Sequence, residues 1–281
     1  MADFMKKFFK KIIFYSFSPN ILSKRILNIL LVMFFNTFAF LNGYKKRIIS
    51  QQENNFFKNK LNRMKSINKL EEIKLKHPFL NDPMSSEHQV LFSGIALSKI
   101  NKISNILEIG TYDGKNAFLL SQLFPNASIT TLDLKDDDLN FKNSYNRYNS
   151  FEKFTADRNN ILKLSKNIIF IQKNSLFLTH ETKRYDLIWI DGAHGYPVVT
   201  IDIANSLRLI SKSGLVMCDD VFTTKLINKD SMYSSDASYN TLQHLRNAKL
   251  LDYDLFFKRL SLSDNSNPFK RKYIALIKLK N

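Results

Sequence analysis

Short apolar runs rich in β-branched and aromatic residues alternate with helical patterns from about residue 105 onward in this chain of 281 residues. Strands that alternate with helices form mostly parallel sheets with helices on both faces, so this alternation leaves few folds open. It predicts a doubly wound α/β domain around a mostly parallel, seven-stranded sheet. The expected strands are Ile106–Ile109, Ser128–Leu132, Asn167–Ile171, Tyr185–Ile190, Leu215–Cys218, Tyr253–Phe257 and Tyr273–Ile277.

Positive charge is concentrated at the N-terminus. Residues 1–65 hold 13 Lys and Arg against two acids, which places +11 of the formal net charge of +17 in this segment. Basic residues spread over the whole chain would indicate nucleic acid as a partner, whereas this distribution indicates a basic extension on a more balanced domain. Cys218 is the single cysteine, so an intramolecular disulfide is excluded, and no Cys/His spacing indicates structural zinc.

Two apolar segments lie within the extension. In Met5–Ile13, apolar residues and lysines fall on opposite faces of a helix, and Pro19 is expected to end that helix. Residues 26–44 form a second apolar run of about the length that crosses a bilayer. Because both of its flanks are basic, a helix lying in the membrane interface fits this run as well as a spanning helix. We expect residues 1–50 to form a membrane-seeking helical segment, with residues 1–47 contacting an anionic membrane surface.

Two alternatives remain for these apolar side chains: they pack on the following domain, or they form a contact between copies in a homo-oligomer. Nothing in the cysteine content requires an oxidising compartment, so we expect a cytoplasmic protein associated with the membrane through this segment. Residues 51–104 are predicted to be a helical lead-in with breaks around His77-Pro78 and Asp82-Pro83. Ser85 or Ser86 is expected to cap a helix that ends near Lys99. The α/β domain then occupies residues 105–281.

The first predicted strand leads through a glycine-containing loop into a helix. Gly110 and Gly114 bracket the loop, and Ala117–Leu123 has a helical pattern. Glycines allow the backbone to approach a ligand, and the helix N-terminus then faces that ligand. Asp133 ends the second strand, where a carboxylate can accept hydrogen bonds from both hydroxyls of a ribose. A plain NAD-binding domain is the alternative, but the Gly-x-Gly-x-x-Gly spacing is missing.

The fourth and fifth predicted strands both end in acids. Asp191 opens the segment Asp-Gly-Ala-His-Gly-Tyr, which includes His194, and the pair Asp219-Asp220 follows the fifth strand. Because α/β folds bind ligands at the carboxyl ends of their strands, these acids are expected near the glycine loop.

The glycine loop resembles the first motif of the class I S-adenosylmethionine-dependent methyltransferases, acid-x-Gly-x-Gly-x-Gly. Glu108, Gly110 and Gly114 match this motif, and Tyr112 stands where it often has its middle glycine. The Asp-Gly-Ala-His segment and the later Asp-Asp pair resemble the O-methyltransferase branch that includes the cephalosporin-biosynthesis, macrocin and related sugar-modifying enzymes. The resemblance covers about residues 85–225 and implies a Rossmann-like fold that binds S-adenosylmethionine.

The resemblance also implies roles for individual residues. Asp191, Asp219 and Asp220 would hold a divalent cation, for which Mg²⁺ suits the oxygen ligands, and this ion would lower the pKa of an acceptor hydroxyl. His194 would be the general base, with Asp191 in the same catalytic group. The expected cofactor contacts are Glu108, Gly110, Tyr112, Gly114, Asp133, Asn174, Ser175 and Asp191. The insert expected to cover the substrate is residues 221–250, with Met232, Tyr233, Tyr239 and Asn240.

We therefore expect O-methylation of a small-molecule or saccharide hydroxyl. A nucleic-acid methyltransferase is one alternative, suggested by the isoelectric point near 9.7. It lacks support because the chain has neither an Asn/Asp-Pro-Pro-aromatic motif nor a Pro-Cys nucleophile, so nucleic acid is not expected as a partner. A non-catalytic, membrane-associated protein that retains the fold is the other alternative, suggested by Tyr112.

Overall fold

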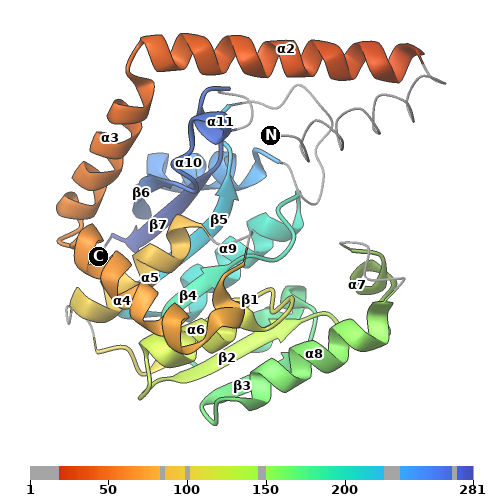
Figure 1. Cartoon of the computed structure of the whole chain (residues 1–281). Helices are drawn as coiled ribbons and strands as arrows, with labels where there is room; N and C mark the ends of the chain where they lie inside the picture. The colour runs from red at the N-terminus through yellow and green to blue at the C-terminus, as the bar shows by residue number, and fades with distance from the viewer. Residues whose placement is uncertain are drawn as a thin grey trace.

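The centre of the protein is a seven-stranded sheet with the order β3-β2-β1-β4-β5-β7-β6 (Figure 1). The computed structural model describes residues 19–82, 86–98, 102–144, 150–224, 235–267 and 271–280. The strands are β1 (Asn105–Ile109), β2 (Ser128–Asp133), β3 (Ile168–Gln172), β4 (Tyr185–Ile190), β5 (Ile210–Val221), β6 (Leu251–Phe257) and β7 (Tyr273–Leu279). All pairings are parallel except those of β7, which runs antiparallel to both neighbours. The predicted doubly wound, mostly parallel sheet is confirmed.

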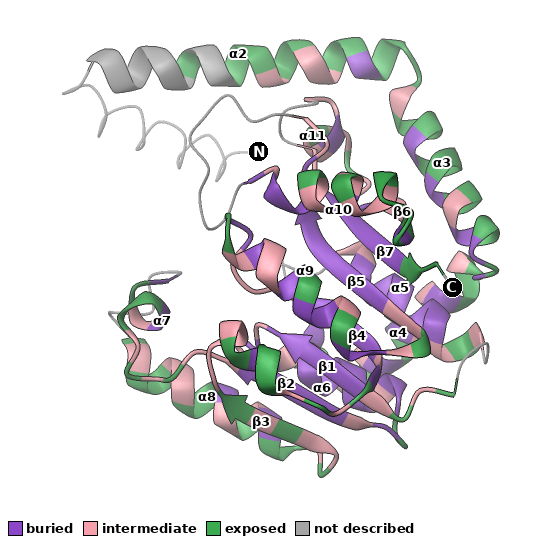
Figure 2. Cartoon of the chain, turned by 180° about the vertical axis from the view of Figure 1, so that it is seen from behind, coloured by how far each residue is buried: buried purple, intermediate pink, exposed green. Residues whose placement is uncertain are grey.

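Both faces of the sheet are buried along its central strands β1 and β4 (Figure 2). Ile106 and Trp189 lie in an apolar cluster with Leu70, Phe92 and Phe118, whereas Leu107 and Ile188 lie in a second cluster with Val199 and Leu242. Neighbouring residues of a strand point to opposite faces, so this division follows from the continuous apolar runs of β1 and β4. The helices that follow the first strand are α6 (Lys115–Leu123), α7 (Leu139–Asn143), α8 (Phe151–Lys163), η3 (Ser175–His180), α9 (Val198–Leu209), α10 (Ala237–Asn247) and α11 (Leu262–Asn265).

The predicted lead-in packs into the same core as the sheet. Phe56, Leu70 and Phe92 are buried together with Ile106 of β1 and Phe118 of α6. The elements before β1 are α2 (Pro19–Leu41), α3 (Tyr44–Lys58), α4 (Arg63–Lys76), η1 (Pro78–Leu80) and α5 (Glu87–Ser98). The expected break at His77-Pro78 is confirmed, and the last helix begins directly after Ser86; Ser85 and Pro83 lie outside the described residues.

The apolar run of residues 26–44 forms most of α2, a long helix across one end of the molecule (Figure 1). Gly43, with φ of 61°, lies between α2 and α3 in the left-handed conformation that glycine adopts readily. No helix in the part of the chain that the structure describes is long and apolar enough to cross a membrane. The helix predicted for Met5–Ile13 lies outside the described residues.

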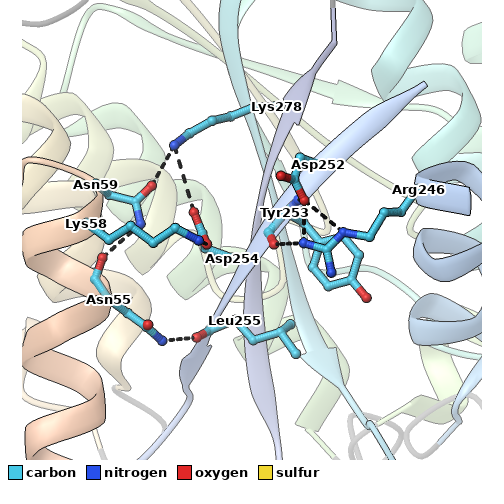
Figure 3. Close-up of polar contacts among 9 residues, drawn as sticks. All are labelled: Asn55, Lys58, Asn59, Arg246, Asp252, Tyr253, Asp254, Leu255 and Lys278. Atoms are coloured by element: carbon cyan, nitrogen blue, oxygen red, sulfur yellow. Dashed lines mark hydrogen bonds and ion pairs between the residues drawn. The ribbon is translucent and has the colours of Figure 1, made fainter. Parts of the chain in front are cut away.

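Side chains from two helices bind the outer edge of β6 (Figure 3). Asn55 of α3 donates a hydrogen bond to the carbonyl of Leu255 at 2.6 Å, and Arg246 of α10 donates one to the carbonyl of Tyr253 at 2.8 Å. Unpaired backbone groups on an edge strand can recruit another strand, and these contacts occupy them. The further contacts along this edge are those of Lys58 and Lys278 with Asp254, and those of Gln52 with the backbone of Phe257.

Candidate active site

A cavity of about 790 Å³ opens at the carboxyl ends of the parallel strands. Ten of the eleven predicted site residues line it: Glu108, Gly110, Tyr112, Asp133, Asn174, Ser175, Asp191, His194, Asp219 and Asp220. The eleventh, Gly114, does not line the cavity. A volume of this size is typical of small-molecule and cofactor sites.

Gly110 is where the glycine loop touches the loop after β4. Its φ is 102°, and a Cβ atom built there would lie 2.3 Å from the carbonyl oxygen of Asp191, so only glycine fits. Gly114, with φ of 77°, precedes α6 and packs against Leu162 of α8 instead of facing the cavity. The predicted cofactor contact at Gly114 is therefore not supported, and this glycine serves the turn into α6.

Glu108 is buried beneath the glycine loop and is bound by uncharged donors. Asn116 donates to its carboxyl group at 2.7 Å and Thr131 at 2.6 Å. The Thr131 hydroxyl also lies 2.7 Å from that of Thr111. Burial raises the pKa of Glu108 to about 8, with the two hydrogen bonds opposing the shift. At neutral pH this carboxyl group is therefore mostly protonated, and it connects β1, β2 and the start of α6.

Asp133 holds the tip of the same loop. Its carboxylate accepts the backbone N–H of Tyr112 at 2.9 Å and that of Leu134 at 2.8 Å. Tyr112 has φ of 50°, and its ring packs against Phe154 at 5.3 Å between centroids. Helix α8 therefore accommodates the Tyr112 side chain at the position where the motif often has a glycine. Asn174 and Ser175 lie after β3, where the Asn174 side chain accepts the N–H of Leu176 at 3.0 Å and begins η3.

His194 is buried between two acids on the opposite side of the cavity. Its Nε2 lies 3.5 Å from Oδ1 of Asp191 and 3.8 Å from Oδ2 of Asp220, while its Nδ1 is a buried atom with no hydrogen-bond partner. Burial lowers the pKa of His194, but the hydrogen bond that its imidazole donates to Asp191 and the charge of Asp220 outweigh burial and raise the pKa overall. Burial and the Asp219 carboxylate raise the pKa of Asp191 to about 6.

Two lysines bind the acidic pair after β5. Nζ of Lys258 lies 2.5 Å from Oδ2 of Asp219 and 2.5 Å from Oδ1 of Asp220, and Nζ of Lys272 lies 2.6 Å from Oδ2 of Asp220. Burial raises the pKa of Asp220, but Lys258, His194 and Lys272 reverse the shift and hold it well below its ordinary value. Burial likewise lowers the pKa of Lys258, and the acids Asp219, Asp220 and Asp191 reverse this and raise it. Asp220 and Lys258 are therefore charged at neutral pH.

The contacts of Lys258 and Lys272 determine whether Asp219 and Asp220 can hold the predicted Mg²⁺ ion. Within the described residues, no group of three or more His, Cys, Asp and Glu side chains is arranged to hold a metal ion. Asp219 directs Oδ2, and Asp220 both of its carboxylate oxygens, to ammonium groups instead, while Oδ1 of Asp219 is buried without a hydrogen-bond partner. A divalent cation brought to these carboxylates would meet the positive charge of Lys258. The side chains present do not fit the predicted ion.

The sequence analysis missed Lys258 and Lys272, whose only signal in the sequence is that each lies beside a predicted strand. Lys258 follows β6 directly, and Lys272 directly precedes β7. Because β7 is antiparallel to β5 and β6, the end of β6 and the start of β7 lie at the edge that carries the acids. Val221 and Phe257 both pair with Tyr273, which places Lys258 beside Asp220.

The residues expected to cover the substrate are only partly described. Met232 and Tyr233 lie outside the described residues. Tyr239 and Asn240 belong to α10 and do not line the cavity, so their predicted role as a cover is not supported. The described residues that extend the cavity wall beyond the strand ends include Arg259, Asp264 and Asn265, together with Tyr196 and Val198.

Comparison with known proteins agrees with this geometry. Residues 107–221 match the family model described as a methyltransferase domain. No curated protein sequence gives a significant match to the chain. The match covers β1 to β5 and every strand end that carries a predicted acid.

Solved structures with a similar fold are distant in sequence. The S-adenosylhomocysteine-bound methyltransferase PaMTH1 of Podospora anserina shares 19% identity over 77% of this chain and 88% of that chain, with a TM-score of 0.46. The O-methyltransferase TomG of Streptomyces achromogenes, involved in tomaymycin synthesis and solved with S-adenosylmethionine, shares 13% identity over 66% and 77% of the two chains, with a TM-score of 0.43. Such values add nothing on the substrate. The match of residues 107–221 to the methyltransferase-domain model supports a methyltransferase.

Proposed function

We propose that this protein is an S-adenosylmethionine-dependent methyltransferase that acts on a hydroxyl group of a small molecule or saccharide. The observation that carries the proposal is the convergence of the predicted residues, which come from five strand ends and line one cavity. The match to the methyltransferase-domain model supports the reaction class, and the buried imidazole–carboxylate pair supports an acceptor that must lose a proton.

The residues near the glycine loop fit the cofactor. Gly110 allows close approach of the backbone, Asp133 has carboxylate oxygens for the ribose hydroxyls, and Asn174 and Ser175 lie after β3 for the base. When bound, S-adenosylmethionine supplies a methyl group whose bond to sulfur breaks with its electron pair going to sulfur, while the acceptor oxygen bonds to the methyl carbon and releases its proton.

The other half of the cavity fits the task of receiving that proton. His194 is assigned the role of general base through Nδ1, which has no hydrogen-bond partner, while Nε2 faces the carboxylates of Asp191 and Asp220, which stabilise the imidazolium that forms. Most of the remaining work is to hold the acceptor oxygen in line with the methyl group.

Calorimetric titration of the full-length protein with S-adenosylmethionine tests the cofactor assignment. We expect micromolar affinity for the wild type and an affinity about 100-fold weaker for Asp133→Ala, because hydrogen bonds to a charged group are lost. Asp157→Ala, an exposed acid of α8, is the matched control and should bind like the wild type. Absence of binding by the folded wild type would exclude this function and favour a non-catalytic protein that retains the fold.

We also propose that α2 holds the protein on an anionic membrane surface. Its apolar side chains Leu30, Met33, Phe34 and Phe38 are exposed, and residues 4–52 contain no acid but have basic residues on both sides of the helix. An apolar helix with basic flanks binds the interface of anionic bilayers.

This placement would bring the cavity close to the membrane. Asn36 of α2 contacts the Ser266 hydroxyl at 2.6 Å, and the preceding residues Asp264 and Asn265 line the cavity. The arrangement favours an amphiphilic acceptor whose hydroxyl lies at the membrane surface.

Vesicle flotation tests the membrane proposal. The full-length protein should float with phosphatidylcholine vesicles that contain about 30% phosphatidylglycerol and remain unbound with phosphatidylcholine alone. Phe34→Ser with Phe38→Ser should weaken flotation several-fold, whereas Phe57→Ser, a control at an exposed phenylalanine of α3, should not. Absence of flotation, with a concentration-dependent dimer in solution, would assign the face of α2 to a second copy.

A further inference from the structure

The half of the cavity that is proposed to bind the acceptor contains a buried cluster of five charged or titratable groups. Asp191, His194, Asp219, Asp220 and Lys258 all line the cavity, and the side chain of Asp219 is 2% exposed while that of Lys258 is 15% exposed. Burying a carboxylate costs several kcal/mol unless an opposite charge and hydrogen bonds compensate it. Something in this cluster must therefore neutralise the acids.

Lys258 has the position and the charge for that role. Its ammonium group bridges the two neighbouring acids, at 2.5 Å from one oxygen of Asp219 and 2.5 Å from one oxygen of Asp220. A divalent cation bound by both Asp219 and Asp220 would occupy the same position as this ammonium group. An ammonium group has three N–H donors, and these two contacts use two of them. The remaining donor is available for an oxygen atom of a molecule in the cavity.

We propose that Lys258 replaces a divalent cation in this site, as a fixed ammonium that holds Asp219 and Asp220 and binds the acceptor oxygen. The inference rests on the proposed function for the identity of the acceptor, but the exclusion of a metal ion rests on the contacts of Lys258 alone. The protein accordingly binds its cofactor and acceptor without Mg²⁺ or Mn²⁺. Lys272, whose side chain is 36% exposed, adds a second, weaker contact to Asp220.

Binding of MnCl₂ to the full-length protein, followed by electron paramagnetic resonance, tests this without any acceptor. We expect no bound Mn²⁺ in the wild type up to about 1 mM, and an affinity for S-adenosylhomocysteine that EDTA changes less than about twofold. Stoichiometric Mn²⁺ binding in the micromolar range that Asp219→Asn abolishes would overturn the proposal. Failure to bind S-adenosylhomocysteine would instead overturn the proposed function and leave the Mn²⁺ result intact.

Replacement of Lys258 gives a second, independent test of the proposal. Lys258→Met should lower the melting temperature by on the order of 10 °C, because it leaves buried carboxylates uncompensated. Added Mn²⁺ should then raise the melting temperature of this variant and not that of the wild type, since the vacated position now suits a cation. Lys58→Met removes a lysine–aspartate contact at the surface and is the matched control, with a decrease of about 2 °C and no response to Mn²⁺.

A Lys258→Met variant as stable as the wild type, and unaffected by Mn²⁺, would contradict the proposed role of the ammonium. If this variant does not fold, Lys258→Arg keeps the charge and should retain most of the stability without acquiring a response to Mn²⁺. In that event the titrations of the wild type and of Asp219→Asn with MnCl₂ decide whether the acids hold a metal ion.

Discussion

The two halves of the cavity stabilise their buried acids in opposite ways. Beneath the glycine loop, Glu108 is bound by the hydroxyl of Thr131 and the amide of Asn116, and its raised pKa of about 8 keeps it mostly neutral. Across the cavity, Asp219 and Asp220 form ion pairs with ammonium groups. One half is a neutral hydrogen-bonded framework, and the other is a cluster of fixed charges.

This difference matches what each half is proposed to do. A cofactor that is itself charged needs shape and hydrogen bonds more than extra charge, so a neutral framework under the loop suffices. An acceptor that loses a proton during the reaction needs nearby charges that do not have to rearrange. The contrast predicts that an uncharged replacement of the buried acid is tolerated at Glu108 and damaging at Asp219.

Gly110→Ala should have the largest effect, because Gly110 is the point where the two halves touch. A methyl group there would lie 2.3 Å from the Asp191 carbonyl, at a φ of 102° that alanine adopts poorly. We expect a loss of about 4 kcal/mol in the free energy of unfolding and loss of S-adenosylhomocysteine binding. Gly43→Ala, at φ of 61° with open space around it, is the control and should cost about 1 kcal/mol in urea unfolding. Equal effects at both glycines would show that the contact with Asp191 is unimportant.

Asp219→Asn should cost about 3 kcal/mol, because it leaves Lys258 with one carboxylate fewer in a buried position. The corresponding change in the neutral half, Glu108→Gln, keeps hydrogen-bonding atoms in place and should change the free energy of unfolding by less than about 1 kcal/mol near pH 5. Urea unfolding of both variants measures the difference. A larger loss for Glu108→Gln than for Asp219→Asn would contradict the comparison.

The pH dependence of stability should also distinguish Glu108. Its pKa rises from about 4.5 in the unfolded chain to about 8 in the folded protein, so the folded state holds one proton more between these values. The stabilisation is complete below the unfolded pKa and is lost as pH rises through 8, at up to about 1.4 kcal/mol per pH unit for this group. Glu108→Gln should remove this slope from unfolding curves recorded between pH 5 and pH 8. An unchanged slope would show that Glu108 is ionised in the folded protein.

Lys272→Met should have the smallest effect, a loss of less than about 1 kcal/mol. The side chain of Lys272 is partly exposed, and Asp220 keeps its contact with Lys258 in the variant. Thermal unfolding beside Lys258→Met measures the ratio of the two effects. A loss as large as that of Lys258→Met would show that both ammonium groups are needed to neutralise the acids.

Much of the fold and half of the site could be predicted from local sequence patterns. Continuous apolar runs identify the strands, and Gly110 and Asp133 stand at strand ends whose meeting point follows from parallel pairing. Asp191 and His194 share one short segment, so their proximity is also a local property. These features depend on residues close together in the chain.

The partners of the acids could not be predicted in this way. Lys258 lies 39 residues after Asp219, and its position beside the acids depends on the antiparallel insertion of β7 between β5 and β6. No local pattern specifies that order of strands. The same limit explains Gly114, whose motif position implies a ligand contact although its neighbour in space is Leu162 of α8.

The position of Lys258 also determines when the site is completed during synthesis of the chain. The ribosome makes every predicted cofactor contact and all three acids before it makes β6, and the compensating lysine follows 39 residues after Asp219. A nascent chain that ends near residue 224 would therefore contain the acids without the ammonium that neutralises them. Both lysines that bind the acids flank β6 and β7, which are translated after β5.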